Sequence, residues 1–213
     1  MMRSSKECNL LVAGVGGQGS VLIGNILGNA AIEEGLEVWV GETFGMSQRG
    51  GSVVSHVRIS RDIISPITPE GAGHAILGLE PLETLRVAGK FLHLGGKVII
   101  NPRPLLPSDV ISGLATYPSL DQMMASLKKI AGSVVQIPAA KLAEASGSNM
   151  TVNTVMLGAL AASGLLPLSA SSIEEALRDG VPPKTVDVNM RAFHLGADAM
   201  IRSAAANPER EKL

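Results

Sequence analysis

The residues with the clearest chemical potential in this sequence form a glycine-rich turn. Gly14, Gly16 and Gly19 have the spacing G-x-G-x-x-G, follow a short apolar run and precede a helical pattern, with Gly17 and Gln18 between them. In that setting the first glycine permits a sharp turn, and the second lets backbone N–H groups approach a phosphate. The third allows close packing of helix on strand. The turn is therefore a candidate phosphate site, or alternatively a device for tight packing.

An acidic residue extends this pattern. Glu42 lies 23 residues after Gly19, at the end of the second expected strand, near where a ribose-binding acid is expected in dinucleotide-binding proteins. Gly14, Gly16, Gly19 and Glu42 together support one hypothesis, a stand-alone NAD-dependent oxidoreductase. The continuation of the chain disagrees, because a polar loop and a further strand replace the usual crossover helix.

A polar, glycine-bearing loop follows the second strand. Arg49 offers five donors to a carboxylate or phosphate, and Ser47 and Gln48 add hydrogen-bonding groups. Gly50 and Gly51 give the backbone unusual freedom. A cation between a glutamine and two glycines has little packing purpose, so we interpret Arg49 as a binding residue.

His56 lies in the β-branched run that follows this loop. An imidazole titrates near neutrality when it is unperturbed, so His56 is a candidate proton-transfer or binding group. It is equally an ordinary residue of a strand.

The elements that must position these residues alternate along the chain. Apolar runs bounded by glycine or proline predict strands at 9–13, 36–40, 52–60, 74–79, 97–100 and 134–137. Helical periodicity predicts helices at 20–34, 81–88, 120–131, 139–146, 151–163, 172–178 and 185–205. This order predicts an α/β fold: a mostly parallel sheet with helices on both faces and a helical C-terminal third. We expect residues 1–213 to form one domain.

Composition excludes several classes of function. A net charge of −1 provides no basic surplus for nucleic acid. A single cysteine, Cys8, excludes a disulfide within the chain and a four-thiolate iron–sulfur cluster, and we interpret it as a small buried residue. No paired His–carboxylate metal pattern is present. The sequence shows neither a signal peptide nor an apolar run of membrane-spanning length, so we expect a cytoplasmic protein.

Four segments resemble one enzyme family. They are AGVGGQGSVLIGNILG, GETFGMSQRGGSVVSHVRIS, SPITPEGAGHAILGLEPLETLR and NTVMLGALAASGLLPLS. Together they are similar to the gamma-type subunit of the 2-oxoacid:ferredoxin oxidoreductases, called the beta subunit in the indolepyruvate enzymes. The resemblance spans roughly residues 9 to 195, and the SQRGG form of the loop points towards the arylpyruvate (indolepyruvate) branch.

The resemblance implies a Rossmann-like domain within a larger enzyme that oxidatively decarboxylates a 2-oxoacid. Thiamine diphosphate, magnesium and iron–sulfur clusters are implied on a partner subunit, with ferredoxin as acceptor and coenzyme A as co-substrate. This chain is then expected to bind no cofactor alone and to be inactive when isolated. It could form a homodimer in that state, because apolar surface would be left uncovered.

Under that reading the glycine turn and the SQRGG loop face coenzyme A, the substrate or the partner. The candidate residues are Gly14, Gly16, Gly17, Gln18, Gly19, Glu42, Ser47, Gln48, Arg49, Gly50, Gly51 and His56. Two alternatives remain open: the stand-alone NAD enzyme and a scaffold with no site of its own.

Overall fold

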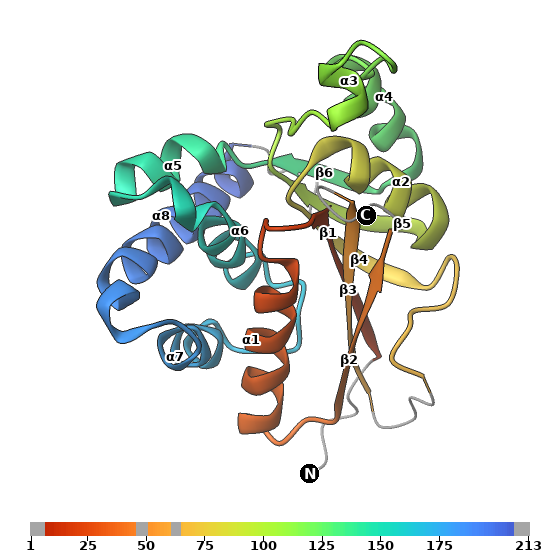
Figure 1. The fold of residues 1–213 in the computed structure, drawn as a ribbon. Helices are drawn as coiled ribbons and strands as arrows, with labels where there is room; N and C mark the ends of the chain where they lie inside the picture. The colour runs from red at the N-terminus through yellow and green to blue at the C-terminus, as the bar shows by residue number, and fades with distance from the viewer. Residues whose placement is uncertain (1–6, 46–50, 61–64, 207–213) are drawn as a thin grey trace.

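The computed structural model describes residues 7–45, 51–60 and 65–206. They form a six-stranded sheet in the spatial order β2-β3-β1-β4-β5-β6 (Figure 1). In chain order the strands are β1 (Cys8–Val15), β2 (Val38–Phe44), β3 (Ser52–Ile59), β4 (Gly73–Gly78), β5 (Leu92–Ile100) and β6 (Ser133–Gln136). The pairs β1–β4, β4–β5 and β5–β6 are parallel, whereas β3 is antiparallel to both β1 and β2. Among the described strands only β3 runs against the others, which confirms the mostly parallel sheet.

Helices cover both faces of this sheet, as expected. They are α1 (Ser20–Glu33), α2 (Pro81–Phe91), α3 (Ser108–Ile111), α4 (Leu120–Ile130), α5 (Ala139–Ser146), α6 (Val152–Ala161), α7 (Ala170–Gly180) and α8 (Val186–Ala205), with 3-10 turns at Asn149–Thr151 and Pro183–Thr185. Helix α1 and helices α5–α8 pack on one face, and α2 and α4 pack on the other (Figure 1). The chain after β6 is helical, which confirms the helical C-terminal third.

The alternation of side chains along β1 explains the two layers. Leu10 and Val12 are fully buried against the α1 face, while Leu11 and Ala13 are fully buried against the α2 face. A strand that is apolar on both sides is typical of the centre of a sheet covered by helices.

Two glycines let α6 and α8 cross in direct contact. A Cβ atom on Gly158 would lie 1.9 Å from the carbonyl oxygen of Phe193, and one on Gly196 would lie 1.9 Å from that of Val155. This contact holds α8 directly against α6 on the α1 face of the sheet. None of the helices in the described ranges is both long and apolar enough to cross a membrane.

Candidate functional site

The glycine turn lies where the strand-to-helix connections switch from one face of the sheet to the other. β1 leads into α1 on one face of the sheet, and its parallel neighbour β4 leads into α2 on the other. Open α/β sheets bind ligands outside the carboxyl ends of strands at such a switch point. The glycine turn therefore lies at the carboxyl ends of the strands, at this switch point.

The side chain of Gln18 fills the crevice between these two strands. Its Oε1 accepts a hydrogen bond from the Val15 N–H at 2.9 Å, and its Nε2 donates to the Leu79 carbonyl at 3.3 Å. The Gly16 N–H donates to the Gly51 carbonyl at 2.9 Å. The N–H groups of Val15, Gly16 and Gln18 are thus all used within the chain.

A recess of about 290 Å³ remains above the turn, beside the N-terminus of α1. It is lined by Val15, Gly16, Gly17, Gly19, Ser20, Val21, Phe44 and Val53. Ser20 is 2% exposed, and its hydroxyl has no hydrogen-bond partner. The N–H groups of Ser20 and Val21 have no acceptor within the described part of the chain. A helix N-terminus attracts negative charge, so the recess suits an anionic group carried by an apolar body.

Two glycines of the turn have backbone conformations that other residues rarely adopt. Gly17 has φ +93° and Gly19 has φ +86°. A Cβ on Gly19 would also lie 2.3 Å from the Nδ2 atom of Asn153, whereas one on Gly17 would meet nothing within 4 Å. Gly19 is therefore required both for conformation and for the approach of α6 to the turn.

Glu42 does not lie where the NAD hypothesis needs it. It lies inside β2, paired with Ser55 of β3, and Ser55 in turn pairs with Val12 of β1. The intervening strand β3 separates Glu42 from β1 by two strand spacings, about 10 Å. Glu42 was expected at the end of the second strand but lies inside it, because pairing with β3 in a hairpin, which replaces the crossover helix, extends β2 to Phe44.

His56 is a buried structural residue on the α2 face. It is fully buried, its Nδ1 accepts a hydrogen bond from the Thr68 N–H at 3.2 Å, and its ring packs edge-on against Phe91. Burial, with the nearby charges of Arg58 and Lys90, lowers the pKa of His56 to about 4. It is therefore neutral at physiological pH, and the expectation of titration near neutrality was wrong.

The structure thus brings together one subset of the candidate residues. Gly14, Gly16, Gly17, Gln18 and Gly19 form the turn, and Gly51 reaches it through its carbonyl. Glu42 and His56 lie apart from the turn. Ser47, Gln48, Arg49 and Gly50 lie outside the described residues.

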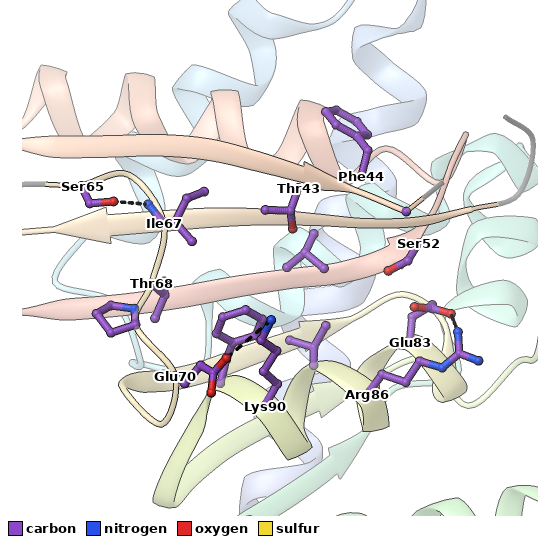
Figure 2. A pocket seen from close by; sticks show the side chains of 15 residues that line it. Thr43, Phe44, Ser52, Ser65, Ile67, Thr68, Glu70, Glu83, Arg86 and Lys90 are labelled. Atoms are coloured by element: carbon purple, nitrogen blue, oxygen red, sulfur yellow. Dashed lines mark hydrogen bonds and ion pairs between the residues drawn. The ribbon is translucent and has the colours of Figure 1, made fainter. Parts of the chain in front are cut away.

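A larger pocket, the α2 pocket, lies on the opposite face between α2 and the ends of β2 and β3 (Figure 2). It has a volume of about 640 Å³, and Val54, Val87 and Phe91 supply apolar lining. Phe44 points away from it, towards the other face of the sheet (Figure 2). The pocket was not anticipated, because its walls come from segments far apart in the sequence.

Two side chains of β3 hold the wall formed by residues 65–70. Arg58 donates to the Ser65 carbonyl at 2.6 Å and to the Asn9 side chain at 2.8 Å, and His56 accepts from Thr68 as described above. Arg58 is 7% exposed and also pairs with Glu7 at 3.0 Å. Hydrogen bonds from Asn9 and Arg58 lower the pKa of Glu7. This network fixes the wall of the pocket to the centre of the sheet.

Two ion pairs lie along the α2 pocket. The Arg86 Nη1 atom is 2.7 Å from Glu83 Oε1, and the Lys90 Nζ atom is 3.6 Å from Glu70 Oε1 (Figure 2). The spacing of Glu83, Arg86 and Lys90 on α2 would place them on one helix face, a signal available in the sequence. Because each cation already has an anionic partner, the pocket carries no net charge that would select a ligand.

The single cysteine is a buried residue, as the sequence indicated. Cys8 is 6% exposed at the start of β1, and burial raises the pKa of its thiol to about 11. A thiol in that state is a poor nucleophile. Within the described ranges no group of three or more His, Cys, Asp or Glu residues is placed to hold a metal ion.

Comparison with known proteins decides the family. Residues 9–199 match the family described as pyruvate ferredoxin/flavodoxin oxidoreductase. The chain belongs to this family. It is 47% identical over 195 residues to indolepyruvate oxidoreductase subunit IorB of Thermococcus kodakarensis, covering 91% of this chain and 96% of that protein.

Solved structures agree. The gamma subunit of a keto/oxoacid ferredoxin oxidoreductase from Geobacter sulfurreducens superposes with a TM-score of 0.66 at 25% identity, covering 92% of this chain and 99% of that one. The 2-oxoglutarate:ferredoxin oxidoreductase of Magnetococcus marinus, solved with 2-oxoglutarate, coenzyme A and succinyl-CoA bound, shares the fold. Its TM-score is 0.69 at 23% identity, covering 93% of this chain and 32% of that one. The chain is a small subunit of a 2-oxoacid:ferredoxin oxidoreductase, and the expected resemblance is confirmed. The NAD-enzyme alternative was wrong, because the relatives that the chain matches are subunits of such complexes.

Proposed function

We propose that this chain is the thiamine-free subunit of an indolepyruvate (arylpyruvate):ferredoxin oxidoreductase of the cytoplasm, with residues 1–213 forming one domain. The observation that supports this substrate class is the 47% identity with the indolepyruvate subunit over nearly the full length of both chains. In the reaction, the 2-oxoacid loses carbon dioxide and two electrons, and its acyl group joins the sulfur of coenzyme A.

The proposal assigns the redox cofactors to the partner. Thiamine diphosphate with magnesium and the iron–sulfur clusters reside on the larger subunit, which passes electrons to ferredoxin. The present chain has one buried cysteine, and no group of metal-ligating side chains is found in its described part. Its own contribution is to complete the active site from the side of the glycine turn, so the isolated chain is expected to be inactive.

The recess above the glycine turn is the proposed contact with coenzyme A. The unpartnered Ser20 hydroxyl and the first N–H groups of α1 fit one of its phosphates, and Phe44 and Val21 offer apolar contact. We include Ser47, Gln48, Arg49 and Gly50 in this proposal from their sequence position, because the next residue, Gly51, hydrogen-bonds to the turn. Glu42 and His56 are assigned no contact with the ligand.

The test is steady-state kinetics of the complex assembled with the thiamine-bearing subunit. Indolepyruvate should be oxidised in preference to pyruvate and 2-oxoglutarate. The change Ser20→Ala should raise KM for coenzyme A about 10-fold, the effect of losing one hydrogen bond to a charged group, with KM for the oxoacid unchanged.

A matched control separates this effect from a general one. Ser55→Ala removes another buried hydroxyl that lacks a partner, but this one lies on β3 away from the recess, so its kinetics should match the wild type. An unaltered KM for coenzyme A in the Ser20→Ala enzyme would remove the recess from the proposal. If Arg49→Ala also left all kinetic constants unchanged, the chain would be a scaffold.

A further inference from the structure

The connection between β5 and α4 exposes an unusual amount of apolar surface. We name residues 103–116 the apolar arm. Leu105, Leu106, Ile111 and Leu114 are 50%, 47%, 74% and 82% exposed, and Arg103 and Asp109 are the only charged residues of the arm. Clustered exposed apolar side chains in a folded protein mark an interaction surface or an aggregation hazard.

A single buried carboxylate anchors the base of the arm. Glu80 is 1% exposed, and its Oε1 accepts hydrogen bonds from the Leu105 N–H at 3.4 Å and from the Tyr117 hydroxyl. Its Oε2 accepts from the Glu83 N–H and so caps α2. Burial and the hydrogen bond to Glu80 raise the pKa of Tyr117, which keeps the phenol protonated as a donor.

The tip of the arm is also ordered by its own backbone. Helix α3 (Ser108–Ile111) starts after Pro107, and Gly113, where φ is +77°, lies two residues beyond its end. The Leu114 N–H then donates to the Asp109 carbonyl at 2.8 Å. This reverse turn presents Ile111 and Leu114 to solvent in a fixed geometry, which lowers the entropy lost when they are covered.

The apolar arm rises from the same edge of the sheet as the glycine turn (Figure 1). Glu80 directly follows Leu79, whose carbonyl accepts from Gln18 of the turn and from Asn101 at the end of β5. Phe44, 69% exposed, lies at the recess on this edge. A protein that covers the edge would therefore contact the arm and the recess together.

We infer that the apolar arm, held by Glu80, is the docking surface for the thiamine- and cluster-bearing subunit. The inference rests on the proposed function. In the Magnetococcus marinus relative, the part that matches this chain is only 32% of a longer polypeptide, so the domain and the remainder are covalently joined there. The present chain matches a small subunit over nearly its full length, and its preorganised apolar arm, with only Arg103 and Asp109 charged, supplies the missing attachment.

The experiment compares exposed apolar side chains at opposite edges of the sheet. One variant carries Ile111→Ser with Leu114→Ser. The control carries Leu94→Ser, because Leu94 is 92% exposed near the start of β5, at the other edge. The Kd of each purified chain for the purified thiamine- and cluster-bearing subunit is measured anaerobically, and thermal melting checks that each is folded. The arm variant should bind roughly 10-fold or more weakly, and the control should bind like the wild type.

The outcomes separate the inference from the proposed function. Wild-type affinity in the folded arm variant overturns the inference alone, as does a loss of self-association without a loss of partner binding. A wild-type chain that fails to bind the thiamine-bearing subunit overturns the proposed function and the inference with it. Should the arm variant melt early, a benzophenone photo-crosslinker at position 114 must label the partner while one at position 94 does not; equal labelling refutes the inference.

Discussion

The glycine turn and the α2 pocket lie on opposite sides of the same sheet and are built differently. The turn is shaped by backbone conformations within residues 14–20, closed by single contacts to Leu79 and Gly51. The α2 pocket is formed by three distant segments whose wall depends on the buried polar side chains of His56 and Arg58. Local backbone chemistry therefore defines the first region, and long-range hydrogen bonds define the second. Changes in the second region should cost more stability.

The largest expected loss of stability comes from Arg58→Ala in the wall of the α2 pocket. It leaves the Ser65 carbonyl and the Asn9 side chain without their donor in a buried setting, so the free energy of unfolding should fall by about 4 kcal/mol. Urea denaturation measures this. Arg178→Ala, which removes an exposed ion pair with Glu174, should cost about 0.5 kcal/mol or less. Equal losses in the two variants would show that the wall does not depend on Arg58.

His56 is the second side chain that holds the wall of the α2 pocket, and the pH dependence of stability tests its role. The pKa of His56 is about 4 in the folded protein against 6.5 for a free imidazole, so between these values the unfolded chain binds a proton that the folded chain does not. The stability that the folded protein gains by keeping His56 neutral is fully present above pH 6.5. It is lost as the pH falls towards 4, by at most about 3 kcal/mol. His56→Asn keeps an acceptor for the Thr68 N–H without titrating, so its urea midpoint should fall less steeply over this range. Parallel curves for the two proteins would contradict the assignment.

Two glycines of the glycine turn differ in what an added side chain would contact. Gly17→Ala meets only backbone strain and should lower the free energy of unfolding by about 1 kcal/mol. Gly19→Ala adds the contact with Asn153, so its cost should be about 2 kcal/mol. Thermal melting of both variants measures the difference. A larger cost at Gly17 than at Gly19 would show that the approach of α6 is not what requires glycine there.

Much of the fold was predictable because its signals are local. The apolar runs that became β1, β4, β5 and β6 are bounded by glycine or proline, and helix α5 was predicted at its observed bounds, Ala139–Ser146. The glycine turn was placed correctly between β1 and α1, because its glycines directly follow an apolar run and precede a helical pattern. Strand β2 was predicted too early, at 36–40 against Val38–Phe44, because its pairing with β3 extends it beyond its apolar residues.

The sequence by itself determined the α/β class and the glycine turn, since both depend on residues close together in the chain. It also determined the enzyme family, through a resemblance that spans roughly residues 9 to 195. Only the tertiary structure decided that Gln18 closes the crevice, that His56 supports a wall and is not a titrating site residue, and that Glu42 is separated from the turn by a strand. It also revealed that Leu105, Leu106, Ile111 and Leu114 stay exposed. The physical reason is that hydrogen-bond partners, burial and strand order are set by contacts between distant segments, which spacing along the chain does not record.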